Sequence, residues 1–470
     1  MKDYLRTKYF LVLIEVLMLS MAVSGQEGYR VTVKIDGNSD TALLLTCYYG
    51  SKIKLVDTAT LVSKGTFVFE GKSRLPGGIY MAVTPDKKKL FEFLIGKNQV
   101  FKLESDTIDY AVQMKTTGSE ENQVFYDYLK FNERNYQQNK SIVEELKEAA
   151  DSTHRYKQLR NQSDSLNKRS IGYKMEVIAQ HPDLFVSTLF NAMRDVEVPD
   201  SVLHGADSSQ AFKYYKRHYW DHFDLSDSSL LRTPLIVNKL DQYFERAVFL
   251  HPDSVVVAID DVISRARPSY EMVSYLVWHF MSEYQNPKYM GFDNIFVHLV
   301  DQYFSKEAIQ NTSPSVLTML TDRANVIRPL LLGKQAPNLV LVDTSGQLKS
   351  LYTLQHAYNL VLFWDYDCGI CKREIADLEK IYNQKTYDLE IFSVCVNGDL
   401  DKWKKSIGER QMPWINVNGT RSATPDFHDL YDIHGTPVIY LLDREMKIIA
   451  KRISADQIPD LIDNMAQTKK

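Results

Sequence analysis

The sequence predicts a protein of three folded domains: a β-sandwich-like N-terminal domain, an α-helical middle domain and a C-terminal α/β domain. A chain of 470 residues is too long for one core, because single hydrophobic cores stop growing at about 250–300 residues. Along the chain, short alternating apolar runs give way to long stretches without glycine, and these give way to strands that alternate with helices. These changes place the domains at 26–117, 118–330 and 331–470.

Composition indicates an ordinary folded protein. Hydrophobic residues make up 44% of the chain and charged residues 25%, which argues against disorder and against collagen-like repeats. The net charge of −4, without a long cluster of Lys and Arg, gives no electrostatic basis for binding nucleic acid or anionic lipid. We therefore expect no nucleic-acid partner.

Residues 1–25 have the layout of a secretory signal peptide. Basic residues, among them Lys2 and Lys8, precede an apolar run over 9–23, and the small residue Gly25 follows it. A membrane anchor needs about 17–25 apolar residues, whereas this run is shorter and contains Glu15. We expect cleavage near Gly25, export to the periplasm or cell envelope, and no stable membrane span afterwards. The alternatives are an uncleaved anchor and a cytosolic start.

The first domain is expected to consist of short strands. Six apolar stretches, several of them with period-two alternation, are divided by Gly, Pro, Asn and Asp, which favour turns. Six strands at this spacing indicate an antiparallel sandwich or barrel. The predicted strands cover 29–35, 42–49, 65–71, 77–84, 90–96 and 99–105.

The middle domain is expected to consist of long amphipathic helices packed as hairpins. Leu159 and Leu166 lie one heptad apart among many charged residues. The tripeptide His-Pro-Asp occurs at 181–183 and at 251–253, and each copy is predicted to begin a helix. A degenerate helical repeat is one reading of these two copies. No motif in this domain predicts a chemical function.

The third domain is expected to be a mixed sheet covered by helices. A hairpin is predicted over 338–351, an unbroken apolar strand over 359–365 and a second apolar strand over 389–397. A helix over 372–383 connects these two strands. The remaining predicted elements are helices near 399–408 and 426–433, a strand pair over 437–443 and 447–453, and a last helix from Asp456.

Two of the four cysteines, Cys368 and Cys371, lie where the first of these strands meets its helix. Four cysteines are too few for a disulfide framework in a chain of this length, so the pair needs another explanation. A helix N-terminus stabilises an anion and lowers the pKa of a thiol there. The second cysteine, one turn further on, can resolve a mixed disulfide. This arrangement is what thiol–disulfide exchange requires.

Three other roles for the pair are less consistent with the sequence. A zinc site would need two more ligands, but no second Cys-x-x-Cys exists and Cys395 falls in an apolar strand. A structural disulfide would close a loop too short to stabilise the fold much. A peroxide-reducing cysteine would follow a Pro-x-x-x-Thr-x-x-Cys pattern, but Val361 and Asp365 occupy those positions. We expect neither a metal nor a cofactor.

The motifs FWDYDCGICKRE and GTPVIYLLD, the second about 65 residues after the first, resemble the thioredoxin superfamily. Within it, the resemblance is to exported thiol–disulfide oxidoreductases of the TlpA/ResA type, and it covers about 331–470. The order of a β-rich, a helical and a thioredoxin-like domain is similar to that of multidomain members of this group. The resemblance implies a thioredoxin-like fold for the third domain.

The resemblance also implies roles for single residues. Cys368 would be the attacking thiolate and Cys371 the resolving thiol. Pro437 would be the cis-proline that faces the active-site disulfide, and Thr436 before it would bind an extended substrate chain through its backbone. Glu374 matches a glutamate near the cysteines and is a candidate proton acceptor for Cys371; the alternative is a solvated glutamate that the helix dipole favours.

Trp364, at the end of the Phe-Trp strand, is a further candidate for substrate binding, beside Thr436 and Pro437. Cys395 and Cys47 both lie in predicted strands, where buried, unreactive thiols are common.

The sequence departs from its relatives at two places. Leu362 stands where thioredoxin has a buried aspartate, so proton transfer must use another group. The residues between the cysteines are Gly-Ile, where oxidising relatives often place His. Ile370 can neither donate a hydrogen bond nor carry charge, and Asp365 and Asp367 oppose a thiolate, although two basic residues after Cys371 partly offset them. A reductant-leaning pair is therefore predicted.

The sequence thus predicts an exported thiol–disulfide oxidoreductase that exchanges or reduces disulfides in disulfide- or thiol-containing partner proteins. It does not identify the upstream electron donor. The alternative is a non-catalytic binding or assembly protein that uses the thioredoxin fold as a scaffold.

Overall fold

The computed structural model describes residues 28–148, 154–205, 207, 209–306, 309 and 312–468. The predicted signal peptide, residues 1–25, lies outside the described residues. The chain divides into two compact units: the first lies within 1–248 and 262–273, and the second within 249–261 and 274–470. The three domain ranges given above remain predictions.

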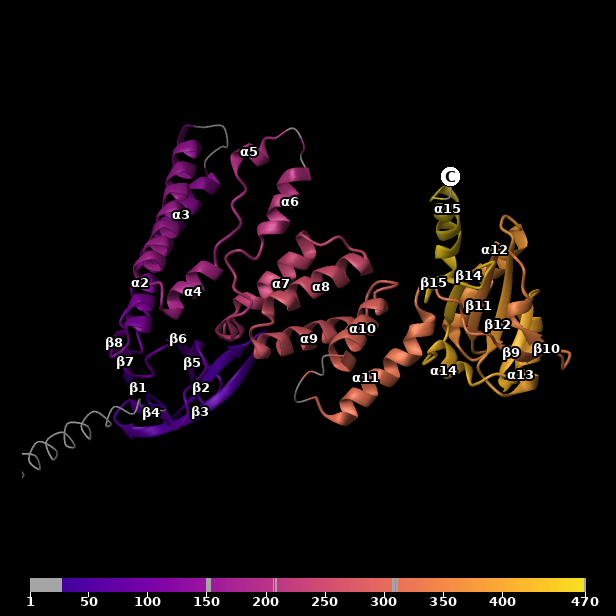
Figure 1. Cartoon of the computed structure of the whole chain (residues 1–470), viewed down its shortest axis with the longest axis horizontal. Helices are drawn as coiled ribbons and strands as arrows, with labels where there is room; N and C mark the ends of the chain where they lie inside the picture. The colour runs from indigo at the N-terminus through magenta and orange to yellow at the C-terminus, as the bar shows by residue number, and fades with distance from the viewer. Residues whose placement is uncertain are drawn as a thin grey trace, which may run out of the picture. The chain divides into compact units, whose positions relative to one another are not determined.

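The first unit begins with an eight-stranded sheet (Figure 1, indigo). The strands follow one another across the sheet in the order β6-β5-β2-β3-β4-β1-β7-β8. Their bounds are β1 Tyr29–Asp36, β2 Ala42–Tyr49, β3 Lys52–Ser63, β4 Thr66–Gly71, β5 Gly78–Val83, β6 Lys89–Ile95, β7 Val100–Asp106 and β8 Lys115–Thr117.

The six predicted strands are all present, as β1, β2, β4, β5, β6 and β7, and the β-rich character of this part of the chain is confirmed. The expectation of purely antiparallel pairing was wrong in one place, because β1 and β7 run parallel. The edge strand β8 has three residues and was not predicted.

The long strand β3 was also missed by the sequence analysis. It pairs with β2 as far as Thr60 and with β4 from Leu61 onward, so it joins the two halves of the sheet. Its apolar residues Ile53 and Leu55 are exposed and only Ala59 is buried. Burial of one face, which makes a strand easy to recognise in a sequence, is therefore nearly absent here.

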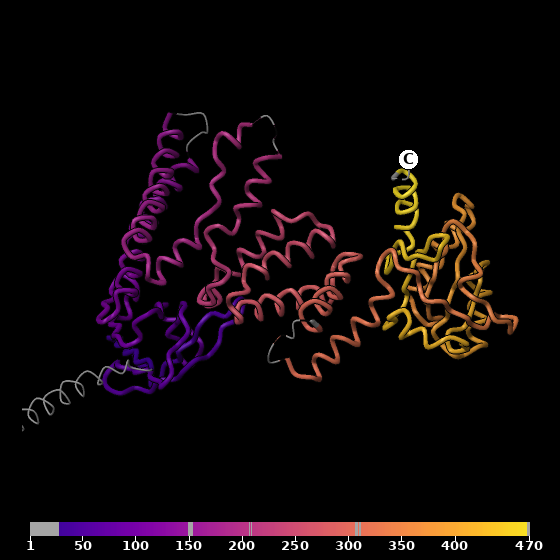
Figure 2. The backbone as a smooth tube through the Cα atoms, in the orientation of Figure 1, coloured from indigo at the N-terminus to yellow at the C-terminus, as the bar shows by residue number. Residues whose placement is uncertain are grey.

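Helices follow the sheet in the first unit. They are α2 Glu120–Glu148, α3 His154–Gln180, α4 Phe185–Ala192, α5 Asp200–Leu203, α6 Ser209–His218, η1 Ser228–Arg232 and α7 Leu235–Arg246. The backbone tube shows α2 and α3 as two long helices side by side (Figure 2). Stacking of Phe131 on Tyr173, with ring centroids 4.5 Å apart, helps to hold this predicted hairpin together.

Further helices lead toward the C-terminal sheet. They are α8 Pro252–Ala266, α9 Tyr270–Tyr284, α10 Asp293–Leu299, η2 Val300–Lys306, α11 Pro314–Ile327 and η3 Arg328–Leu330. Of the two His-Pro-Asp tripeptides, the second begins a helix at Pro252 as predicted, whereas the helix after the first begins only at Phe185. Within the described ranges, no helix has the length and hydropathy needed to cross a membrane.

The C-terminal part of the second unit is a seven-stranded sheet with helices on both faces (Figure 1, orange to yellow). The strand order is β10-β9-β13-β12-β11-β14-β15, in which β11, β12 and β13 are parallel and the other neighbours antiparallel. The elements are β9 Val340–Asp343, β10 Leu348–Ser350, η4 Leu351–Thr353, β11 Tyr358–Trp364, α12 Gly369–Gln384, β12 Leu389–Cys395, α13 Leu400–Glu409, β13 Ile415–Ser422, α14 Phe427–Tyr431, β14 Val438–Asp443, β15 Ile448–Lys451, η5 Ala455–Gln457 and α15 Ile458–Thr468.

The central strand β11 is buried on both sides, as the unbroken apolar run predicted. Val361 and Phe363 point into one hydrophobic core, while Leu360, Leu362 and Trp364 point into the core on the opposite face. The mixed α/β fold predicted for this domain is confirmed.

Strand β13 was not predicted, because asparagines interrupt its apolar pattern. Asn416 accepts a hydrogen bond from Ser393 Oγ at 3.1 Å and donates to backbone carbonyls, and Asn418 Nδ2 donates to Asn397 O at 2.8 Å. The buried amides are thus satisfied inside the sheet, which only the assembled neighbours make apparent.

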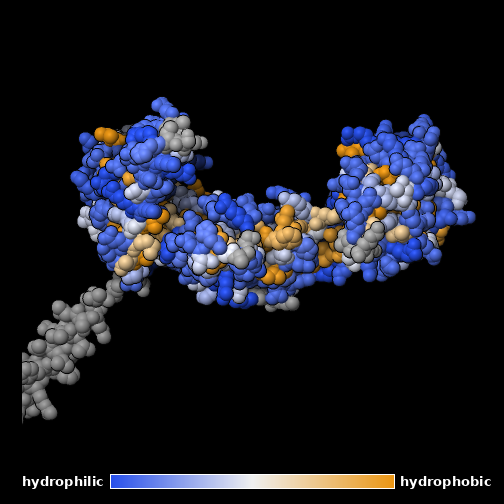
Figure 3. Space-filling model, turned by 90° about the horizontal axis from the view of Figure 1, so that it is seen from above, coloured by the Kyte–Doolittle hydropathy of each residue, from blue (hydrophilic) through white to orange (hydrophobic). Residues whose placement is uncertain are grey.

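The face of the molecule shown in Figure 3 is mostly hydrophilic, with separate hydrophobic patches. One exposed hydrophobic side chain, Ile370, lies between the two cysteines of the predicted redox pair.

Candidate redox site

A tight turn after β11 delivers Cys368 to the start of α12. Asp365 accepts two hydrogen bonds from the residues that follow it. Asp367 N donates to its side chain at 2.8 Å, and Cys368 N donates to its backbone carbonyl at 3.2 Å. Cys368 is then the N-cap of α12, with extended backbone angles, and its sulfur accepts a hydrogen bond from Cys371 N at 3.1 Å. The thiol therefore occupies the place that a Ser or Asp side chain takes in an ordinary helix cap.

These contacts make Cys368 the more acidic of the two thiols. Partial burial opposes ionisation, but hydrogen bonds from the Cys371 side chain and N–H, from Thr436 and from the Ile370 N–H outweigh it and lower the pKa of Cys368. The unpaired N–H groups and positive dipole end of α12 act in the same direction. A larger fraction of Cys368 is therefore thiolate, the nucleophilic form, at neutral pH.

Cys371 has the opposite character. Its side chain is only 1% exposed, and burial, together with the hydrogen bond to Cys368, raises the pKa of Cys371 to about 12. This thiol therefore stays protonated while Cys368 ionises. The pair consists of one partly exposed, acidic sulfur and one buried, protonated sulfur.

The loop before β14 lies against the reactive sulfur. Cys368 Sγ donates to the carbonyl of Thr436 at 3.6 Å, and the Thr436–Pro437 peptide bond is cis. Strand β14 holds this loop in place because Val438 pairs with Phe363 near the end of β11. The structure therefore brings four of the predicted site residues together: both cysteines, Thr436 and Pro437.

Glu374 has a contact that the sequence did not indicate. Its Oε2 accepts a hydrogen bond from Ala455 N at 2.7 Å, which connects α12 to the start of η5. Among the described residues, no hydrogen bond joins Glu374 to either cysteine. Its role as a proton acceptor remains a prediction.

Trp364 differs from the expectation. Its side chain is 0% exposed and packs in the core beside Leu362, so no part of it can contact a substrate in this conformation. The structure does not support Trp364 as a substrate-binding residue. The physical reason is that β11 is buried on both faces, so that Trp364, its last residue, lies in one of the two cores whichever way it points.

Arg410 is a residue that the sequence analysis missed. It follows α13, donates from Nη2 to Tyr366 O at 2.9 Å in the turn before Cys368, and lies with its guanidinium 5.4 Å from the Trp364 ring. A contact between residues this far apart in the chain leaves no local sequence signal.

The other two cysteines are buried. Burial raises the pKa of Cys395 to about 12 and also raises the pKa of Cys47. Raised pKa values are what the expectation of unreactive thiols requires. In the described ranges, no cluster of three or more His, Cys, Asp and Glu residues is suited to hold a metal ion.

Comparison with known families divides the chain into three parts. Residues 332–451 match the AhpC/TSA family. Residues 29–125 match a domain of unknown function (DUF4369), and residues 152–324 match another (DUF5106).

Two curated proteins are similar to parts of the chain. The thiol-disulfide oxidoreductase ResA of Bacillus subtilis is 28% identical over 121 residues, which are 25% of this chain and 64% of ResA. Probable nucleoredoxin 1 of Arabidopsis thaliana is 33% identical over 85 residues, which are 17% of this chain and 14% of that protein. The chain thus spans less than two thirds of the length of either relative.

Solved structures are similar as well. A domain of a possible thiol-disulfide isomerase from Cytophaga hutchinsonii is 36% identical; the match covers 30% of this chain and 96% of that one, with a TM-score of 0.28. A thioredoxin-like protein from Bacteroides caccae is 21% identical; the match covers 57% of this chain and 97% of that one, with a TM-score of 0.45.

Proposed function

Because residues 332–451 form a thioredoxin-like domain of the AhpC/TSA family, related to a thiol-disulfide oxidoreductase, we propose that the chain is an exported enzyme that exchanges or reduces disulfides in partner proteins. The observation that carries this proposal is the unequal pair at the start of α12. Cys368 accepts the N–H of Cys371 and has a lowered pKa, whereas Cys371 is buried with a raised pKa.

The proposed reduction proceeds in two steps. The Cys368 thiolate attacks one sulfur of a substrate disulfide, so that a mixed disulfide forms and the other substrate sulfur leaves as a thiolate. Cys371 then loses its proton and attacks Cys368 Sγ, which forms the Cys368–Cys371 disulfide and releases the second substrate sulfur. The substrate gains two electrons, which the enzyme pair loses. Of the two protons that the substrate thiolates take up, one comes from Cys371 through the proton acceptor and the other from solvent. A thiol-containing electron donor then returns the pair to the dithiol form.

The second step needs a proton acceptor, because the pKa of Cys371 is raised to about 12. Glu374 is the proposed acceptor, three residues further along α12, where a side chain lies on nearly the same face of the helix as Cys371. Its hydrogen bond with Ala455 N uses one carboxylate oxygen and leaves the other to accept a proton.

Substrate binding is proposed at the loop around Thr436 and Pro437. The Thr436 backbone lies beside Cys368 Sγ, where an extended substrate chain could pair with it. Ile370, which is 52% exposed between the cysteines, offers an apolar contact for the side chains near a substrate disulfide. These contacts are compatible with many proteins, since they use backbone and apolar surface.

The pair is proposed to lean toward reduction. The Ile370 side chain supplies no hydrogen bond or charge to the thiolate, and its contribution is limited to the backbone N–H. We therefore expect a potential well below about −120 mV, the value of the most oxidising proteins of this chemistry.

Export is proposed from the basic, apolar and small residues of the N-terminus. Cell fractionation, with sequencing of the mature N-terminus, tests this part separately from the chemistry. A mature protein that begins near Gly25 and lies in the cell envelope is the expected result.

Reduction of insulin by dithiothreitol tests the chemistry. The wild-type protein should accelerate the reaction, the Cys368→Ala variant should not, and Cys395→Ala should act as wild type because Cys395 is buried away from solvent. Equal rates for wild type and Cys368→Ala would favour a non-catalytic binding protein. The Cys371→Ser variant should retain substrates as mixed disulfides, which identifies them by mass spectrometry.

A further inference from the structure

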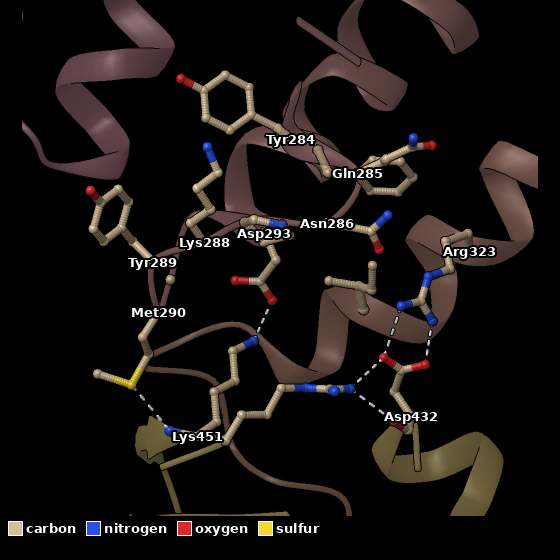
Figure 4. A pocket seen from close by; sticks show the side chains of 15 residues that line it. Tyr284, Gln285, Asn286, Lys288, Tyr289, Met290, Asp293, Arg323, Asp432 and Lys451 are labelled. Atoms are coloured by element: carbon tan, nitrogen blue, oxygen red, sulfur yellow. Dashed lines mark hydrogen bonds and ion pairs between the residues drawn. The ribbon is translucent and has the colours of Figure 1, made fainter. Parts of the chain in front are cut away.

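A buried carboxylate, Asp432, lies four residues before Thr436 in the loop that reaches the reactive sulfur. Its side chain is 6% exposed, and its backbone has the left-handed conformation (φ 55°) that ends α14. The carboxylate has three side-chain partners, of which Figure 4 labels Arg323. Arg323 contacts both of its oxygens, with Nη2 to Oδ2 at 2.9 Å, Arg452 Nη2 donates to Oδ2 at 2.8 Å, and His434 Nε2 lies 2.9 Å from Oδ1.

These partners keep Asp432 charged although it is buried. Burial alone would raise its pKa, but the two guanidinium groups and His434 outweigh that effect and lower the pKa of Asp432. A buried charge depends on each of its partners, and bidentate pairing with arginine also fixes the orientation of the carboxylate. The position of Asp432 is therefore set by the side chains around it.

Residues 432–437 connect this ion-pair cluster to the redox site. At one end, Asp432 is held by its side chain and by a bond from Arg452 Nη2 to its carbonyl at 2.8 Å. At the other end, Val438 is held in the sheet opposite Phe363. Between them, the carbonyl of Thr436 accepts the bond from Cys368 Sγ. A shift of Asp432 therefore changes the position of Thr436 against the sulfur.

Arg323 comes from outside the thioredoxin-like domain. It lies on α11, Pro314–Ile327, before the residues that match the AhpC/TSA family at 332–451. The same residue borders a cavity of about 370 Å³ and is 37% exposed, so it is accessible from solvent. The helical segment before the domain thus supplies a charge that the loop of the redox site depends on.

We propose that Arg323 and Asp432 are positioning residues for the redox site: their ion pair sets the conformation of residues 432–437 and thereby the contact of Thr436 with Cys368. This inference rests on the proposed function only in that Cys368 is the reactive thiol. It adds a route by which a change in α11, such as a partner that displaces Arg323, alters the reactivity of Cys368.

The test is the pH dependence of Cys368 alkylation by iodoacetamide in the full reduced protein, read by mass spectrometry of the Cys368 peptide. Arg323→Ala leaves the loop less fixed and weakens the side-chain hydrogen bond of Thr436 that lowers the pKa of Cys368, so the midpoint should move to higher pH. The thiolate fraction at pH 7 should fall about threefold or more, as expected for loss of a coupling residue. Arg323→Lys keeps the positive charge, so its midpoint should lie between those of the wild type and of Arg323→Ala.

The chain offers a matched control in Arg328. It is the first residue after α11, pairs with Asp301 at 2.6 Å, and is 40% exposed, nearly the same as Arg323. Arg328→Ala removes a similar ion pair that does not contact the loop, and the alkylation midpoint should stay at the wild-type pH. Where Arg323→Ala does not fold, Arg323→Gln, which keeps a polar side chain, is measured in its place.

An unshifted midpoint in the Arg323 variant, or an equal shift in Arg328→Ala, would overturn this inference. Alkylation reads the thiol directly, so the result does not depend on catalysis. A shifted midpoint in a protein that fails to reduce insulin would overturn the proposed function and leave the positioning role in place.

Discussion

The N–H of Cys371 donates to the sulfur of Cys368 at 3.1 Å, so one cysteine of the pair stabilises the anionic form of the other. The same burial that places Cys371 behind the helix end raises its own pKa to about 12. The chemical difference between the two thiols therefore follows from their positions in a single helical turn, and it can be measured.

The first prediction concerns the ionisation of Cys368. Its pKa is lowered by hydrogen bonds in the folded protein, so alkylation of the folded, reduced protein should have a midpoint below the value of about 8.5 for free cysteine. Unfolding in guanidinium chloride should return the midpoint to about 8.5. A group with a depressed folded pKa stabilises the fold above its unfolded pKa, and this contribution is lost as the pH falls through the folded value. A folded midpoint at or above the unfolded one would contradict the prediction.

The second prediction concerns Ile370, which is exposed beside the reactive sulfur. Ile370→His introduces a hydrogen-bond donor that stabilises the thiolate and hence the reduced form, so the reduction potential should rise by about 30 mV for each tenfold change in the equilibrium constant. Equilibration of the protein with mixtures of reduced and oxidised glutathione measures the reduction potential. Ile370→Ala, which removes the side chain without adding a donor, should leave the potential nearly unchanged, and a rise of equal size there would refute the explanation.

The third prediction concerns Glu374. Glu374→Gln keeps an oxygen that accepts the hydrogen bond from Ala455 N, but an amide does not act as a base. Resolution of the mixed disulfide should therefore slow by about tenfold or more. Stopped-flow measurement of product release reports this step. Glu379→Gln, on the same helix, is the matched control. If Glu374→Gln resolves mixed disulfides at the wild-type rate, Glu374 serves only to hold η5.

The fourth prediction concerns Trp364. Because its side chain is fully buried, Trp364→Ala should lower the free energy of unfolding by about 3–5 kcal/mol, measured by denaturant titration. Trp364→Phe should lose less. In variants that remain folded, KM for a protein disulfide should stay close to the wild-type value. An increase in KM without a matching loss of stability would show that Trp364 does contribute to substrate binding.

The redox pair could be predicted from the sequence because its signal is local: two cysteines, a preceding apolar strand and a following helix lie within a few residues. The same holds for β11, whose unbroken apolar run requires burial on both faces, and for the mainly apolar β12. Strand β13 could not be predicted in this way, since its asparagines are satisfied only by neighbours that the fold supplies.

Contacts between distant residues had no such signal. The bond from Arg410 to the turn before Cys368, and that from Ala455 to Glu374, join residues about 40 and 80 positions apart. The burial of Trp364 was also missed, although the unbroken apolar run of β11 would have indicated it.

The carbonyl of Thr436 accepts a hydrogen bond from the Cys368 thiol. An incoming polypeptide that pairs with this carbonyl would take the thiol's place on it. Docking would then bring the substrate disulfide beside the sulfur along the same stretch of main chain, so that recognition and attack use one short loop.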